Sequence, residues 1–266
     1  HGRMGISAVP GSGKTHTLSY LAASLIARQQ IQDDQEILIV TLSNSAANNF
    51  ISRIESFLSE FDLLPGLGYR VRTLHGLAHD IVRERPDLAG LSDRFQIADE
   101  STADQILTSV SQAWLRANPA FVLEWSDPDQ SPQSNPGLIK KWQTNLTRLG
   151  QAVVRQAKDL QITPSELRQR LPGNPSPLLL FAAEVYNDYQ RALAYRSAVD
   201  FDDLIRLALQ ALSSDPDYLS RLRYRWPYIL EDEAQDSSRL QEHILRLLVG
   251  EEGNWVRVGD PNQAIY

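Results

Sequence analysis

The chain has 266 residues, 42% hydrophobic and 22% charged, which is ordinary globular composition with length for one large domain or two smaller ones. It has no cysteine, which excludes disulfides and cysteine-based metal sites and is compatible with a reducing, cytoplasmic location. It shows no signal peptide or apolar run long enough for a membrane span, and its net charge of −7 argues against a passive nucleic-acid binder while allowing an enzyme with a local groove.

The first third of the chain alternates short apolar strands with amphipathic helices. Residues 4–9 predict a buried strand, and residues 13–29 predict a helix with leucines near helical spacing. Two more strand–helix pairs follow, at residues 36–42, 44–58, 70–74 and 75–85. This alternation predicts a parallel sheet covered on both faces by helices.

The middle of the chain has a different pattern. From about 86 to 196 helical periodicity dominates, interrupted by predicted loops at 126–136 and 172–177. The end returns to α/β character, with a strand at 228–230, a helix at 240–248 and a strand at 255–258. We therefore expect an α/β fold with an inserted all-helical subdomain.

A phosphate-binding loop follows the first predicted strand. Its residues are Ala8-Val9-Pro10-Gly11-Ser12-Gly13-Lys14-Thr15. In such a loop backbone N–H groups wrap the phosphates, so we expect Lys14 to reach the β and γ phosphates and the Thr15 hydroxyl to bind Mg²⁺. Ala8 stands where the strict pattern has glycine, and the alternative is a glycine-rich turn with an exposed lysine. The flanking strand and helix favour the nucleotide site.

A phosphate-binding loop needs an acidic partner at the end of a neighbouring strand. Glu231, Asp232 and Glu233 follow the predicted strand at 228–230. We expect Asp232 to hold Mg²⁺ and Glu233 to orient and deprotonate the attacking water. The alternative is a solvated acidic turn, which the coupling to the phosphate-binding loop disfavours.

Several segments now resemble, in order, the motifs of superfamily 1 DNA helicases of the UvrD/PcrA/Rep type. Residues 90–195 carry almost no such motif. The segments are Val40–Ala47, similar to TFTNKAA; Thr73–His79, similar to TFHGLAH; Asp200–Leu204, matching DFDDL; Asp232–Asp236, similar to DExQD; and Gly259–Tyr266, similar to GDxxQxIY.

The resemblance implies an ATP-dependent translocase or helicase on single-stranded DNA, of 3′→5′ polarity, that works at a duplex junction with ATP and Mg²⁺. It implies a RecA-like core at 1–85 and 197–266 with the helical insertion at 86–196. The family's second RecA-like domain and its arginines lie outside these residues. Because arginine fingers are worth about 10³–10⁵ in rate, we expect this chain alone to bind ATP weakly and hydrolyse it very slowly.

The resemblance also implies residue roles. Gln263 would sense the γ-phosphate, Gln235 would join the ATP state to the DNA site, and His16 stands where an arginine packs on adenine. The nucleotide-contacting set is Pro10, Gly11, Ser12, Gly13, Lys14, Thr15, His16 and Gln235, and the catalytic set is Glu233, Asp232, Lys14 and Gln263. The residues along the single strand, touching phosphate and sugar, would be Thr41, Asn44, Thr73 and His75.

Some positions depart from the family pattern. Leu42 replaces a phenylalanine, Ser45 a lysine, Glu231 an apolar residue and Ala234 an aromatic residue. These departures keep open a degenerate member that acts as an ATP switch or scaffold in DNA repair. A third reading is the front part of a RecB/AddA-like helicase–nuclease, on which this sequence is silent.

Smaller signals have plainer interpretations. Asp200 is expected to cap the following helix rather than bind metal. Arg148, Arg155 and Lys158 share a helix face, which we interpret as solvated, with duplex contact as the alternative. Two tryptophans are expected in the core, Trp114 and Trp142.

Overall fold

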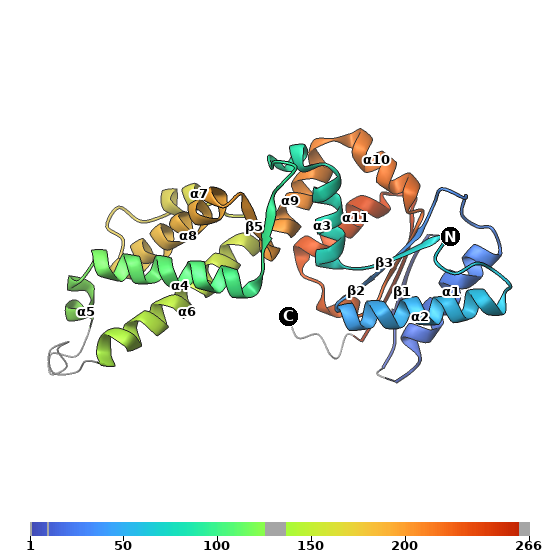
Figure 1. Cartoon of the computed structure of the whole chain (residues 1–266), viewed down its shortest axis with the longest axis horizontal. Coiled ribbons are helices and arrows are strands. Elements are labelled where there is room, and N and C mark those ends of the chain that lie inside the picture. The colour runs from blue at the N-terminus through green and yellow to red at the C-terminus, as the bar shows by residue number, and fades with distance from the viewer. Residues whose placement is uncertain (1, 10, 126–136, 261–266) are drawn as a thin grey trace. The chain divides into compact units, whose positions relative to one another are not determined.

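The structure is a computed structural model that describes residues 2–9, 11–125 and 137–260 (Figure 1). It divides into two compact units, one made of the chain up to Gly90 and from Leu207 onward, the other of Leu91–Arg206. The first unit is α/β, and the second is helical apart from one small sheet. None of the helices in the described residues has the length and apolarity that a membrane span needs. The α/β class with a parallel sheet is as expected.

The α/β unit is built on a five-stranded sheet of order β1-β7-β6-β2-β3, in which every pair is parallel. Its register places Glu231 opposite Arg257 and Thr41 opposite Thr73. Because all the strands run the same way, their carboxyl ends gather at one edge, where ligands bind in open α/β sheets. The strands are β1 (Arg3–Ser7), β2 (Ile37–Thr41), β3 (Tyr69–Thr73), β6 (Tyr228–Glu231) and β7 (Asn254–Gly259).

Helices cover both faces of this sheet. On one face, α1 (Lys14–Ala27) and α2 (Asn44–Glu60) bury Leu18, Phe50 and Ile54 against the strands. Figure 1 shows α3 and α11 on the other side of the sheet. The remaining elements are α3 (Leu74–Glu84), η1 (Pro86–Ala89), α9 (Phe201–Ser214), α10 (Pro216–Arg225), η2 (Ala234–Asp236) and α11 (Arg239–Val249).

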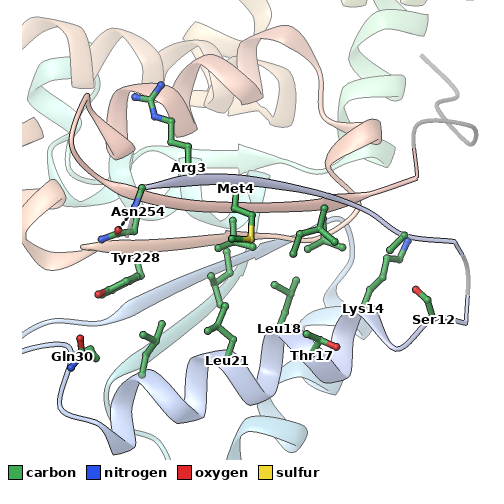
Figure 2. A pocket seen from close by; sticks show the side chains of 17 residues that line it. Arg3, Met4, Ser12, Lys14, Thr17, Leu18, Leu21, Gln30, Tyr228 and Asn254 are labelled. Carbon is green, nitrogen blue, oxygen red and sulfur yellow. Dashed lines mark hydrogen bonds between the residues drawn. The ribbon is translucent and has the colours of Figure 1, made fainter.

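The first strand is less buried than its sequence predicts. Every residue of β1 is exposed, including Met4 at 58% and Ile6 at 37%. Among the described residues β1 lies at one edge of the sheet, and a cavity of about 490 Å³ lies between it and α1. Figure 2 shows Met4 facing Leu18 and Leu21 across this cavity, with Lys14 at one end. The prediction of a buried strand was wrong because an apolar pattern reports a preference for burial, not the presence of a covering element.

The second unit is a bundle of helices with a two-stranded parallel sheet that the sequence did not predict. Its core contains Leu146, Phe181 and Val185. Trp114 and Trp142 pack against this core, as expected, and the Trp114 Nε1–H donates to Glu184 at 2.7 Å. The elements are β4 (Gln96–Ala98), α4 (Glu100–Ala117), α5 (Ala120–Glu124), α6 (Gly137–Asp159), α7 (Pro164–Gln169), α8 (Pro177–Tyr195) and β5 (Ala198–Asp200).

One basic residue of α6 is placed differently from the prediction. Arg148 and Arg155 are exposed, as a solvated face requires. Lys158 is only 1% exposed, and its Nζ lies 2.5 Å from Asp200 Oδ2 and 3.0 Å from Asp203 Oδ2. The prediction was wrong for Lys158 because polar spacing along a helix does not reveal that the carboxylates of Asp200 and Asp203, which lie in other elements, meet one of its positions.

The carboxylate of Asp200 serves several donors at once. Its Oδ1 accepts from the Asp203 backbone N–H at 2.9 Å, which confirms the predicted helix cap. Its Oδ2 accepts from the Tyr189 hydroxyl at 2.6 Å as well as from Lys158. Burial raises the pKa of Asp200, but Lys158 and these hydrogen bonds outweigh burial and leave the pKa lowered.

Candidate functional site

The phosphate-binding loop connects β1 to α1. Gly11 has φ of 75° and Gly13, the N-cap of α1, has φ of 83°. Both values lie in the left-handed region, where glycine has no steric penalty. Lys14 is therefore the first residue of a helix whose N-terminal N–H groups favour an anion. Pro10, predicted to contact the nucleotide, lies outside the described residues.

A cavity of about 370 Å³ joins this loop to Glu233, which follows β6. It also takes in Arg53 of α2, which the sequence reasoning missed. The Arg53 Nε–H donates to Asn49 at 2.7 Å, and its guanidinium gives the cavity a second cation suited to phosphate. A lone arginine within a helix carries no motif, so no sequence signal pointed to it. The lining residues are Gly11, Gly13, Lys14, Thr15, His16, Arg53 and Glu233.

Asp232 is a buried carboxylate with an oxygen that a cation could satisfy. It is 6% exposed, and among the described residues its Oδ1 has no hydrogen-bond partner. Burial, and then the charge of Glu233, raises the pKa of Asp232. A buried carboxylate oxygen without a donor is costly unless a cation satisfies it, and hard divalent ions prefer such oxygens. The residues present therefore fit Mg²⁺, with the half-buried Thr15 as a second oxygen ligand.

Glu233 is held in an unusual backbone conformation. Its φ of 53° lies in the left-handed region, which costs a residue with a side chain about 1–3 kcal/mol and is maintained only by its surroundings. Its Oε2 accepts from Lys14 Nζ at 2.9 Å and from Gln235 Nε2 at 2.9 Å. Burial raises the pKa of Glu233, but the hydrogen bonds from Gln235 and Lys14 outweigh burial and lower it. Glu233 is thus ionised and paired with the lysine of the phosphate-binding loop.

Gln235 links the acidic loop after β6, residues 232–236, to the end of β7. Its Oε1 accepts from the Asp260 backbone N–H at 3.0 Å. A Cβ on Gly259 would lie 2.4 Å from that same oxygen, so only glycine permits the approach. This contact fixes the position of the Gln235 side chain relative to the end of β7. Gln263, predicted to sense the γ-phosphate, lies outside the described residues.

The residues predicted to follow a single strand lie at the carboxyl edge of β2 and β3. Thr41 and Thr73 are register partners, and Asn44 begins α2. The Thr73 hydroxyl caps α3 by accepting from the Gly76 backbone N–H at 3.1 Å. Asn44 is exposed and His75 half-buried, whereas Thr41 is only 2% exposed. Two helix N-termini therefore lie side by side here, with Thr41 beneath the surface.

The whole chain, residues 1–266, matches the model of the UvrD/REP helicase N-terminal domain family. It is 30% identical over 258 residues to the ATP-dependent DNA helicase PcrA of Bacillus subtilis, covering 96% of this chain and 30% of that protein. It is 29% identical over 266 residues to the ATP-dependent DNA helicase srs2 of Schizosaccharomyces pombe, covering 98% of this chain and 28% of that protein. The chain thus spans less than a third of the length of these relatives.

Proposed function

Because this chain belongs to the UvrD/REP helicase N-terminal domain family, we propose that it is the ATP-binding part of an ATP-dependent motor that moves along single-stranded DNA. The observation that carries the proposal is the cavity that unites Lys14 and Thr15 with Glu233, 219 residues further along the chain. These are the groups that phosphoryl transfer to water requires, namely phosphate donors, a metal ligand and a base.

The chemistry of ATP cleavage falls to a few side chains. Lys14 and the backbone of the phosphate-binding loop bind the phosphates, while Asp232 and Thr15 would hold Mg²⁺, which would supply neutralisation of charge on the phosphate oxygens. Glu233 orients a water and accepts its proton. The ion pair of Lys14 with Glu233 means that the phosphates compete for the lysine, so nucleotide binding frees the carboxylate for that work. At the same cavity, Arg53 is proposed to add a second cation for the phosphates, and His16 to face the rest of the nucleotide.

The DNA side of the proposal rests on the paired helix N-termini after β2 and β3. Asn44, Thr73 and His75 are placed to contact phosphates of a single strand, which positions DNA without reading its sequence. Thr41, being buried, acts by supporting this edge rather than by direct contact. By the family resemblance we propose 3′→5′ movement toward a duplex junction. Gln235 and Gln263 would connect this edge to the ATP site.

The share of the relatives' length that the chain covers supports a further part of the proposal. We infer that a second RecA-like domain completes the ATP site, as the family resemblance implies. This chain alone is then expected to bind ATP weakly and to hydrolyse it very slowly, because a missing arginine finger costs about 10³–10⁵ in rate. Robust DNA-stimulated turnover by the 266-residue chain alone would contradict the need for a second domain.

The experiment that tests the function measures ATPase rate with and without single-stranded DNA on the full-length gene product that contains this chain. We expect a large stimulation by DNA that Lys14→Ala abolishes. ATP binding without DNA-stimulated hydrolysis would instead identify a switch or scaffold, the reading that the departures at Leu42, Ser45, Glu231 and Ala234 keep open.

A further inference from the structure

Glu231 is a buried carboxylate directly before the proposed metal ligand. It is 1% exposed, and it occupies a position where the resembled family usually has an apolar residue. Burying a carboxylate is costly unless it is paired and hydrogen-bonded. The partner is Arg257, its register neighbour on β7, whose Nε–H donates to Glu231 Oε2 at 2.8 Å. A pair of charges therefore joins the two strands that end at the site.

Arg257 is itself fixed from three directions. Its guanidinium lies over the Trp255 ring, 4.6 Å from the centroid. Its other N–H group donates to Glu242 of α11 at 3.0 Å, and Glu242 also accepts from Arg246. Because β7 and α11 both hold this arginine, Glu231 has a defined position relative to the sheet and to the helix that follows the acidic loop.

The second oxygen of Glu231 makes a contact across the acidic loop. The Ser237 hydroxyl donates to Glu231 Oε1 at 2.9 Å. Glu231 immediately precedes the loop and Ser237 immediately follows it, so this hydrogen bond, which we name the Glu231–Ser237 bridge, closes the segment 232–236. That segment contains Asp232 and Glu233.

The enclosed segment needs external restraint because Glu233 is left-handed, with φ of 53°. Such a backbone persists only where several contacts determine it. The Asp232 backbone N–H donates to the Val40 carbonyl at 2.9 Å, and Gln235 accepts from the Asp260 backbone N–H at 3.0 Å. These contacts tie the segment to its neighbours, while the Glu231–Ser237 bridge ties its two ends to each other.

We propose that Glu231 and Ser237 are positioning residues that, with Arg257 holding Glu231 in place, set the loop geometry in which Asp232 meets Mg²⁺ and Glu233 meets water. The inference rests on the proposed ATP-binding function and adds residues that position the acidic loop of that site. Glu231 is not one of the residues that line the nucleotide cavity, and both of its oxygens accept hydrogen bonds from Ser237 and Arg257, so its effect on the site is expected to pass through the loop. The bridge therefore matters for the metal-dependent part of nucleotide binding and not for the phosphate-binding loop itself.

The test compares the affinity of this chain for a fluorescent ATP analogue in excess Mg²⁺ and in EDTA. Ser237→Ala removes only the hydroxyl of the bridge, Ser237→Thr keeps a hydroxyl, and Glu231→Gln keeps the shape of the side chain while removing its charge. Ser59→Ala, which removes an exposed hydroxyl from α2, is the matched control. Thermal unfolding followed by circular dichroism establishes that each variant is folded.

We expect Ser237→Ala and Glu231→Gln to reduce the gain in affinity that Mg²⁺ gives by about 3- to 10-fold, the range for one lost hydrogen bond, and to leave the affinity in EDTA unchanged. Ser237→Thr and Ser59→Ala are expected to match the unaltered chain. Ser237→Ala removes the donor of the bridge and Glu231→Gln removes the charge by which Arg257 holds Glu231, so loss of folding in one variant leaves the other as the test.

Equal losses in Mg²⁺ and in EDTA, or an unchanged Mg²⁺ gain in both reducing variants, would overturn the positioning role. Lys14→Ala separates this failure from that of the proposed function, because it removes the phosphate-binding lysine itself. If Lys14→Ala abolishes binding while Ser237→Ala and Glu231→Gln change nothing, only the bridge is wrong. If the unaltered chain binds no nucleotide in either buffer, the proposed function and the bridge both fall.

Discussion

Each unit of this protein contains a lysine paired with carboxylates, and the two clusters differ in what surrounds them. Lys14 and Glu233 are 2.9 Å apart, with side chains 8% and 34% exposed, and they line an open cavity. Lys158 meets Asp200 and Asp203 at 2.5 and 3.0 Å, with side chains 1%, 9% and 3% exposed. Distance alone does not distinguish them, whereas access does.

The two clusters also differ in whether their carboxylate oxygens accept hydrogen bonds. Beside Lys14, Asp232 Oδ1 has no hydrogen-bond partner among the described residues. Beside Lys158, both Asp200 oxygens accept hydrogen bonds, from Asp203, Tyr189 and the lysine itself. An accessible pair next to an unsatisfied oxygen is prepared for a ligand, and a sealed pair with its oxygens satisfied stabilises the fold. The two clusters therefore differ in access and in the satisfaction of their carboxylates, not in the distance between their charges.

The largest expected effect is on the sealed cluster. Lys158→Met leaves Asp200 and Asp203 buried without their counter-charge, and breaking a buried pair in this way costs about 3–5 kcal/mol of unfolding free energy. Urea unfolding measures the loss. Arg155→Met, on the exposed face of the same helix, is the control and should stay within about 0.5 kcal/mol of the unaltered chain. Equal stability of the two variants would remove the distinction between the clusters.

Lys14→Met should show the reverse pattern. The lysine donates charged hydrogen bonds to phosphate, each worth about 1.5–3 kcal/mol, so we expect affinity for Mg²⁺-ATP to fall by about 10- to 100-fold. Unfolding free energy should change by no more than about 1 kcal/mol, because Glu233 is partly exposed and can be solvated when its partner is removed. A large loss of stability with normal nucleotide binding would assign Lys14 to the fold instead.

The smallest expected effect concerns Asp232. Burial, together with Glu233, raises the pKa of Asp232, so the folded chain binds more protons at this group than the unfolded chain does. Its contribution to stability therefore falls as the pH rises through the interval between the unfolded and folded pKa values. Without Mg²⁺ at neutral pH, Asp232→Asn should therefore raise the Tm slightly, with a smaller gain near pH 4.

Thermal unfolding in EDTA at the two pH values measures this gain. Adding Mg²⁺ and ATP should stabilise the unaltered chain and not Asp232→Asn, since the variant lacks the charged metal ligand. A lower Tm for Asp232→Asn at neutral pH would mean that the carboxylate is satisfied in the free protein.

Local runs of residues account for what the sequence could predict. The strands, their flanking helices and the loop around Lys14 are all specified within about ten residues, so periodicity and turn chemistry were sufficient. The strands Gln96–Ala98 and Ala198–Asp200 are too short to show an alternating pattern, so the small sheet was missed. The order of the motifs identified the family, and the chain's match along its whole length supports that reading.

Contacts across the chain account for what was missed. Glu231 was recognised as an unusual carboxylate, but its partner Arg257 lies 26 residues away and is set by the register of β6 and β7. Lys158 was assigned to a solvated face because its partner Asp200 lies 42 residues later in the chain, at the end of β5. Arg53 reaches the phosphate cavity from α2, which follows only from the packing of α1 on α2.

The pairing of β1 with β7 has a consequence for how the protein is made. The Gly2 backbone N–H donates to Asn254, 252 residues later in the chain. At a synthesis rate of about 5–20 residues per second, β1 leaves the ribosome roughly 10–50 s before its partner strand exists. The unit Leu91–Arg206 is complete before β6 is made. Throughout that interval the apolar side chains of Met4 and Ile6 belong to an unpaired strand, so this segment of the nascent chain is exposed to aggregation until β7 is made.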